Sequence, residues 1–265
     1  MTNKSSLSIA LSQEELFVIL AYLHAENLLG LESEIFKELS KDQINLVMGV
    51  AERALVARGF LKPGPENRLQ LEPAVFATLG ACAFPETSLI VTRHRPDAVG
   101  ENYFFHTSRK MIVMHTMPVT AIHQFIAVEE KTAVARAVLS ILSMDSLSKP
   151  KCAAGQIEQA ILVNARDTAQ GQGSEEAFKM LSQTNLGKKT AQELAETLTH
   201  PVANTTLAYI KHNVEGQPSD GFTILQGQNA LWLLAPVEGA KTELISILPV
   251  SAEDAARRVK TLMKL

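Results

Sequence analysis

The stretch that decides the fold, residues 88–118, reads SLIVTRHRPDAVGENYFFHTSRKMIVMHTMP. Short runs rich in β-branched and aromatic residues alternate here with polar segments, which is typical of antiparallel strands joined by turns. A further run, AIHQFIAV, and an amphipathic helical pattern follow directly. Residues 88–128 therefore predict a four-stranded antiparallel meander, and residues 129–142 predict a helix.

A second stretch, residues 206–236, repeats this pattern as TLAYIKHNVEGQPSDGFTILQGQNALWLLAP. Aligned without a gap at an offset of 118 residues (206 minus 88), the two stretches share four identical residues. The identical pairs are Leu89 with Leu207, His94 with His212, Phe104 with Phe222, and Pro118 with Pro236. Helical segments precede the strands and a helix follows them in both cases, so the order of elements indicates an internal duplication.

The predicted fold class is α+β, with two pseudo-symmetric halves that each contain helices, a four-stranded antiparallel meander and a final helix. We expect the halves to interlock, because each alone would leave edge strands and an uncovered sheet face. The first half covers residues 1–149 and the second covers residues 150–265, with a polar linker at 143–156. The second half is expected to hold helices within 156–198, strands within 205–250 and a last helix at 252–264.

The N-terminal segment, residues 12–79, has the outline of a winged helix. Capping boxes at Ser12 and Ser40 begin two amphipathic helices, and ESEIFKEL at 32–39 predicts a short helix between them. Pro63-Gly64-Pro65 then predicts the turn of a hairpin. A DNA-recognition helix needs cations, whereas the helix in that position carries charges of both signs. A DNA-associated winged-helix regulator is therefore the alternative to a structural use of this outline.

The composition of the chain argues against nucleic acid and membranes as partners. The chain has 265 residues, 46% of them hydrophobic, and a formal net charge of −3. No basic tail or stripe is present to neutralise phosphates, so nucleic acid is not the expected partner. No signal-peptide pattern and no apolar run long enough to span a bilayer occur, so we expect a cytoplasmic protein without membrane insertion.

The histidines of the first meander suggest a metal site, and the repeat argues against it. At the offset of 118, His106 and His115 stand opposite Ile224 and Leu233. After Pro118 the offset shifts, and His123 then stands opposite Ile245. Positions that accept Ile or Leu are packing positions on strands. No nucleophile, dinucleotide or metalloprotease motif occurs elsewhere. We therefore expect no catalytic residue, metal or cofactor, and keep a histidine-dependent metal enzyme as a second alternative.

Two short basic segments and the single tryptophan are the candidate partner-binding residues. His94 is the histidine that both stretches share, and two arginines flank it. The turn after the second predicted strand is also basic, because it contains Arg109 and Lys110. Trp232 has Met114 as its counterpart, so a core position is the default and an exposed interface anchor is the alternative. The predicted site is Arg93, His94, Arg95, Arg109, Lys110 and Trp232.

Two stretches carry a resemblance to a known family. LSQEELFVILAYL at 11–23 is similar to the opening helix of the EspG family, the cytoplasmic chaperones of type VII (ESX) secretion. Residues 51–96 resemble that family's next signature, in which a helix ends in an Arg-Gly turn before a hairpin, a helix and a strand that follows a proline. The connections PDAVGEN and VEGQPSD are shorter than the loops with which that family grips substrates.

The resemblance implies a function in binding. Members of the EspG family hold aggregation-prone helical secretion substrates in the cytoplasm, and no binding motif of theirs maps residue by residue onto this chain. We therefore expect a non-catalytic, chaperone-like protein, monomeric or homodimeric. Its partner would be a protein such as a helical secretion substrate, bound through a helical or extended segment.

Overall fold

The computed structural model describes residues 7–32, 36–109, 111–144, 149–212, 220–240 and 242–263. The chain divides into two compact units. The first consists of Met1–Leu89, Asn102–Ala133 and Ile210–Pro218, and the second consists of Ile90–Glu101, Val134–Tyr209 and Ser219–Leu265. Helices and antiparallel strands make up both units, which confirms the α+β fold class. The interlocking of two sequence halves stays a prediction.

The first two helices begin where the sequence offers caps. Ser12 forms a capping box with Glu15 at the start of α1 (Gln13–Leu23), and Ser40 caps α2 (Lys41–Ala57) in the same way. Each box bonds backbone N–H groups that the first turn of a helix leaves without partners. Both predicted helix starts are therefore confirmed.

The predicted hairpin follows α2. β2 (Leu61–Pro63) and β3 (Leu69–Leu71) pair antiparallel around the short 3-10 helix η2 (Pro65–Asn67), and α3 (Pro73–Ala83) comes next. The short helix expected at 32–39 falls partly on residues 33–35, which lie outside the described residues. Phe36 has a 3-10 helical conformation, residues 37 and 38 form a turn, and Leu39 forms a bend.

Four antiparallel strands form the sheet of the first unit. β5 (Glu101–Ser108), β6 (Met111–Val119) and β7 (Ile122–Val128) pair in chain order, as the meander predicts. β1 (Ser8–Ser12), which the sequence did not predict, pairs with β7 and forms the edge of the sheet. β4 (Thr87–His94) runs from the first unit into the second.

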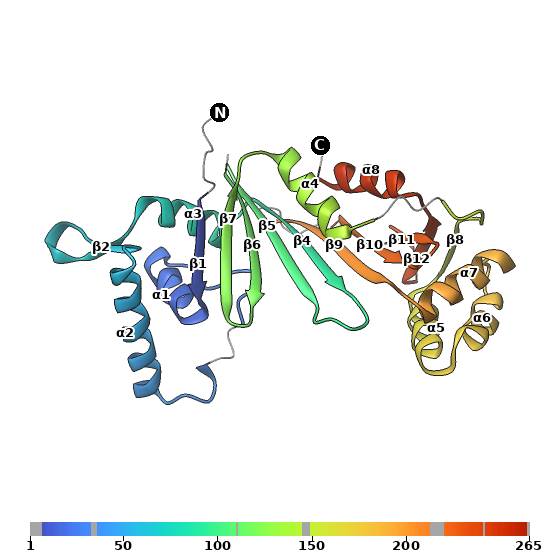
Figure 1. Ribbon diagram of the computed structural model, residues 1–265, viewed down its shortest axis with the longest axis horizontal. Helices are drawn as coiled ribbons and strands as arrows, with labels where there is room; N and C mark the ends of the chain where they lie inside the picture. Colours follow the sequence, from blue (N-terminus) through green and yellow to red (C-terminus); the bar gives the residue numbers. More distant parts are fainter. Residues whose placement is uncertain are drawn as a thin grey trace. The chain divides into compact units, whose positions relative to one another are not determined.

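The core of the first unit lies between this sheet and the helices α1, α2 and α3, which Figure 1 shows to the left of β1. Ile19, Leu55 and Leu79 from the three helices are fully buried against Val113 and Phe125 of the sheet. Full burial of one such side chain contributes roughly 1.5–3 kcal/mol, so this cluster is the main stabilising element of the unit.

The second unit repeats this arrangement of strands. The chain returns to this unit within α4, and the elements from there to the C-terminal helix are α4 (Lys131–Leu142), β8 (Gly155–Glu158), α5 (Gln159–Gln172), α6 (Ser174–Ser182), α7 (Lys188–Thr199), β9 (Ala203–Lys211), β10 (Asp220–Gln226), β11 (Leu231–Pro236), β12 (Leu244–Pro249) and α8 (Ala252–Leu262). β9 to β12 form the predicted meander, and β8 pairs with β12 just as β1 pairs with β7. The prediction of a helix from residue 156 was wrong at its start, because Gln156 and Ile157 bond to β12 instead.

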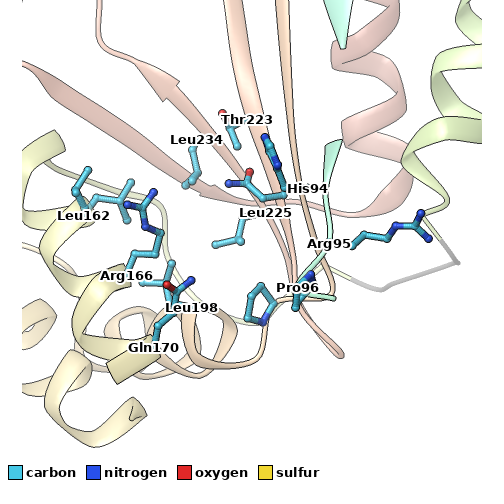
Figure 2. Close-up of a pocket in the computed structure, with 13 residues that line it drawn as sticks. His94, Arg95, Pro96, Leu162, Arg166, Gln170, Leu198, Thr223, Leu225 and Leu234 are labelled. Atoms are coloured by element: carbon cyan, nitrogen blue, oxygen red, sulfur yellow. The ribbon is translucent and has the colours of Figure 1, made fainter. Parts of the chain in front are cut away.

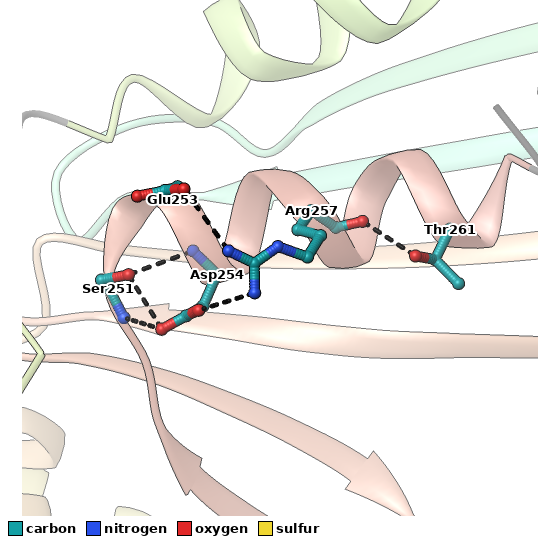
Figure 3. Close-up of polar contacts among 5 residues, drawn as sticks. All are labelled: Ser251, Glu253, Asp254, Arg257 and Thr261. Atoms are coloured by element: carbon teal, nitrogen blue, oxygen red, sulfur yellow. Dashed lines mark hydrogen bonds and ion pairs between the residues drawn. The ribbon is translucent and has the colours of Figure 1, made fainter.

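Helices cover both faces of the second unit's sheet. α5, α6 and α7 enclose a core with Leu225, Trp232 and Ile247 on one face. On the other face α8 lies over β10, where the guanidinium carbon of Arg258 is 5.7 Å from the centre of the Phe222 ring. Ser251 caps α8 through a capping box with Asp254 (Figure 3).

The strand registers correct the alignment of the two hairpins. In the first unit Phe104 on β5 pairs with His115 on β6, on the face that the helices cover. In the second unit Thr223 on β10 pairs with Leu234 on β11, also on the helix-covered face. The two pairs match at an offset of 119 residues (223 minus 104 and 234 minus 115). A shift of one residue exchanges the faces of a strand, so the ungapped alignment compared opposite faces here.

The corrected register changes the counterparts of two histidines. His106 corresponds to Leu225 and His115 to Leu234, each one residue later than the ungapped alignment placed them. Both counterparts are still leucine or isoleucine positions, so the interpretation of these histidines as packing residues is unchanged. The matching registers support the proposal of a duplication.

Within the part of the chain that the structure describes, no helix combines the length and the apolar character that crossing a membrane requires.

Candidate partner-binding pocket

A pocket of about 470 Å³ lies in the second unit between the sheet and the helices α5 and α7 (Figure 2). Leu225 on β10 and Leu234 on β11 form its floor. Leu162 on α5 and Leu198 near the end of α7 close it on the helical side. The lining is therefore apolar at its base, which suits an aliphatic or aromatic group.

Polar groups surround this base. α5 presents Arg166 and Gln170 on the same side as Leu162, because residues four apart on a helix are neighbours. Arg166 Nη2 lies 2.9 Å from the carboxylate of Asp167, which neutralises part of its charge. Asn204 Oδ1 is buried and has no hydrogen-bond partner among the described residues. A rotation of this side chain would be needed before a group in the pocket could donate to that oxygen.

Two of the predicted site residues line the pocket. His94 ends β4, and its ring lies against Gly100, where an added Cβ would be 2.7 Å from the imidazole Cε1. Arg95 is paired with Glu101, and Figure 2 shows its side chain pointing away from the pocket floor. Its guanidinium is thus held at the outer rim. No carboxylate is found among the described lining residues, so an anionic group in the pocket would meet no like charge from them.

Arg93 and Arg109 of the predicted site do not line this pocket. Arg93 precedes His94 on β4, and its half-buried side chain has a buried Nε without a hydrogen-bond partner among the described residues. Arg109 is exposed in the first unit, at the turn between β5 and β6, with a left-handed φ of 53°. Lys110 lies outside the described residues. Their contribution to partner binding stays a prediction.

Trp232 is not an exposed anchor, and this part of the predicted site is corrected. Its side chain is completely buried in the core under α5, α6 and α7. Its indole Nε1 donates a hydrogen bond of 3.0 Å to Thr197 Oγ1 on α7. A buried tryptophan with a satisfied N–H fixes the helix against the sheet and cannot contact a partner directly.

The histidines of the first unit form a buried network. His115 Nε2 and His123 Nδ1 are 2.9 Å apart. The Ser88 hydroxyl lies 3.0 Å from His106 Nδ1 and 2.9 Å from His212 Nε2. His106, His115 and Ser88 have no exposed surface, so none of them meets solvent. Among the described residues no group of three or more His, Cys, Asp or Glu side chains could hold a metal ion.

Burial keeps these imidazoles neutral. It lowers the pKa of His106 to about 4, with a smaller contribution from the neighbouring His212. It lowers the pKa of His115 to about 2, reinforced by His106 and His123. The pKa values of His123 and His212 are also lowered by burial. Nε2 of His106 has no acceptor among the described residues, so a second proton on that ring would be unsatisfied.

The pocket residues on α5 and on the second hairpin were missed from the sequence. The spacing of Leu162, Arg166 and Gln170 was a usable signal, because residues four apart form one helix face. Leu225 and Leu234 lie in runs that predict strands. A strand pattern alone does not tell which face a helix covers and which it leaves open, so these two could not be assigned to a pocket.

Comparisons with known proteins agree with this architecture. A family model described as "Uncharacterised protein YfjC" matches residues 8–251. The chain belongs to the YfjC family. No curated protein matches the sequence of this YfjC-family chain.

A solved structure of similar fold is the type VII secretion system chaperone EspG5 of Mycobacterium tuberculosis, in complex with the PE25-PPE41 dimer. The YfjC-family chain aligns with it at 12% identity and a TM-score of 0.67, over 97% of this chain and 96% of that chain. The predicted resemblance to the EspG family is therefore confirmed as a distant relationship of fold. The structure of HtdX, also from Mycobacterium tuberculosis, aligns at 13% identity over 92% of this chain and 100% of that chain, with a TM-score of 0.16 that carries no argument.

Proposed function

We propose that this YfjC-family protein is a non-catalytic, chaperone-like cytoplasmic protein that binds a helical or extended segment of a partner protein. The binding element is the pocket in the second unit, which takes up an apolar side chain of that segment. A helical secretion substrate is the kind of partner that the fold suggests, because EspG5 has the same fold and is a secretion chaperone solved with a protein dimer.

The observation that carries the proposal is the composition of the pocket. Leucines form its base, whereas His94, Arg166, Gln170 and Asn204 surround them. An apolar base with a few polar groups around it is the usual chemistry of a recognition pocket. The polar groups can bond backbone amides or side chains that flank the inserted apolar residue.

The alternative of a DNA-associated regulator gains no support from α2. A recognition helix presents cations to phosphates and base edges. α2 exposes Lys41 and Arg53, together with the acidic Asp42. It also exposes Leu46 and Val50, which are 67% and 51% accessible. These aliphatic side chains would meet the phosphate backbone without any favourable contact.

A matched pair of variants tests the proposal. Val163 lines the pocket and is 37% exposed, whereas Val202 is 39% exposed in the same unit and is not a lining residue. Val163→Asp places a carboxylate at the pocket, and Val202→Asp places one on the surface outside it. Each tagged protein would be expressed in the source cells, and the proteins it captures would be quantified by mass spectrometry.

We expect one partner to be captured by the wild type and by Val202→Asp but to be reduced at least about tenfold with Val163→Asp. Circular dichroism of both variants checks that each is folded. Capture that is equal for the two variants would refute the assignment of the pocket as the binding site.

A further inference from the structure

A second open apolar surface lies in the first unit, in a groove of about 660 Å³ between β1 and α2. Leu46, Val50 and Ala54 follow one another at intervals of four residues, so they form a stripe along one side of α2. Leu46 and Val50 are large aliphatic residues, yet 67% and 51% of their surfaces are accessible to solvent. Next to this stripe, Ala51 lines the base of the groove and, like Leu55, is buried in the core.

Side chains already bond part of the outward edge of the edge strand β1. The carbonyl of Leu7 accepts a hydrogen bond from the N–H of Ala127 on β7, and the N–H of Gln13 donates to the carbonyl of Ala121 in the turn before β7. Backbone groups of successive residues in a strand point to opposite sides. The even-numbered residues of β1 therefore direct their N–H and C=O groups away from β7. The outward carbonyl of Ala10 accepts a hydrogen bond from Arg58. The N–H of Ser12 donates to the Glu15 carboxylate at 2.9 Å. These side chains protect the edge, which disfavours the addition of an extended segment.

The groove has more negative than positive charges among its described lining residues. Arg58 binds both carboxylate oxygens of Glu15, at 2.8 and 2.6 Å, so these two charges offset each other. Glu14 is the other ionisable residue among the described lining residues. The groove therefore combines an aliphatic stripe with one additional negative charge.

We propose that this groove is a docking site for an amphipathic helix of a partner protein. The helix would lay an apolar stripe against Leu46 and Val50 and direct a lysine or arginine toward Glu14. A helix fits better than a strand because it needs no backbone groups from β1, and its i, i+4 ridge matches the spacing of the stripe on α2. The site lies in a different unit from the pocket at His94, so it does not depend on the function proposed for that pocket.

The test uses a synthetic helical peptide of 17 residues, the length of α2, with leucines along one face and lysines beside them. A second peptide carries glutamates in place of the lysines. Binding of each fluorescein-labelled peptide is measured by anisotropy at low ionic strength. Amide chemical shifts of the labelled protein identify the residues that respond.

We expect the basic peptide to bind with a Kd below about 100 µM and to shift amides of β1 and α2. Val50→Asp should weaken this binding at least about tenfold, since it places a charge in the apolar stripe. Val56→Asp is the matched control, because Val56 is exposed on the same helix and does not line the groove. The control should change the Kd less than about twofold.

Charge reversal gives the sharper result. Wild-type protein should prefer the basic peptide over the acidic one about two- to fivefold, the size expected for an exposed ion pair. Glu14→Lys should reverse the preference. Equal binding of both peptides to the wild type, or equal effects of Val50→Asp and Val56→Asp, would overturn the proposal.

Two other occupants would also overturn the proposal. If a second copy of the chain covers the groove, light scattering will show a dimer that Val50→Asp dissociates. If a strand occupies it, an extended peptide of alternating valine and threonine will bind more tightly than the helical peptide and will gain affinity from Arg58→Ala. Capture by the pocket at His94 should be unaffected by Val50→Asp, which separates failure of this proposal from failure of the proposed function.

Discussion

Mild acid should destabilise the first unit selectively, because its buried histidines must gain protons when it unfolds. His106 and His115 have no exposed surface, and burial lowers their pKa values to about 4 and about 2. In the unfolded chain each ring returns to an ordinary pKa near 6.5. The unfolded state therefore binds more protons below that pH. The stability that neutral imidazoles provide is complete above pH 6.5 and is lost as the pH falls toward 4.

The size of the effect follows from the two pKa values. At pH 5 the unfolded ring is about 97% protonated, whereas the folded rings are at most about 10% protonated, which costs roughly 2 kcal/mol for each histidine. His106 and His115 together thus remove about 4 kcal/mol between pH 7.5 and pH 5, a large share of the ~5–15 kcal/mol that stabilises a typical domain. His123 and His212, whose pKa values are lowered in the same direction, add to the loss.

Hydrogen exchange followed by mass spectrometry can measure this unit by unit. Amides of β5, β6 and β7 report the first unit, and their free energies of opening at pH 7.5, 6 and 5 should decrease in steps after correction for intrinsic exchange rates. Trp232 is the only tryptophan and lies in the core of the second unit, so its fluorescence in urea reports that unit separately. The urea midpoint of the fluorescence change should depend less on pH.

A double variant tests the cause. His106→Leu with His115→Leu introduces the residue type found at the corresponding positions, Leu225 and Leu234. We expect a lower stability at pH 7.5, because His123 loses its partner, but a dependence on pH that is smaller by about 4 kcal/mol between pH 7.5 and 5. An opening free energy of the wild-type strands that stays constant over this range would refute the reasoning, as would an unchanged pH dependence in the double variant.

Three further substitutions test individual contacts by urea denaturation. Ser251→Ala should cost about 1 kcal/mol, since it removes the capping box of α8; Ser251→Asn, another good cap, should cost less. Thr197→Val leaves the Trp232 N–H without its acceptor and should cost about 1–3 kcal/mol, whereas Thr197→Ser should retain most of the stability. Gly30→Ala should cost more than about 2 kcal/mol, because φ is +86° and the new Cβ would also lie 2.5 Å from a phenylalanine ring carbon. Gly59→Ala is its control, with a φ of +73° and open space around the Cβ, and should cost only about 1–2 kcal/mol.

Local chemistry explains which parts of the fold could be predicted. Capping boxes at Ser12 and Ser40 act within four residues, so the helix starts were visible in the sequence. The meanders were visible because alternating β-branched runs and polar turns repeat at short intervals. β1 and β8 were missed because they are only five and four residues long and depend on partners far along the chain, such as β7 for β1.

The pocket was harder to predict than the strands around it. His94 was selected because it is shared by the two aligned stretches, and it does line the pocket. Trp232 was selected for its rarity, yet it is buried, because rarity says nothing about the face of the strand on which a residue lies. The offset of 118 was wrong by one residue in the hairpin, and a one-residue error reverses the face of every side chain.

The corrected register explains why the pocket is found in the second unit. In the first unit the positions on the covered face hold His106 and His115, which pack with Phe104 and Phe125 at ring-centre distances of 4.5 to 6.2 Å. The corresponding Leu225 and Leu234 lack planar rings to stack, and the space above them remains open beneath α5. Aromatic and imidazole rings thus fill in one unit the space that leucines leave accessible in the other. If the halves arose by duplication, this face became a packed core in the first unit, whereas in the second it lines the pocket that we propose for binding.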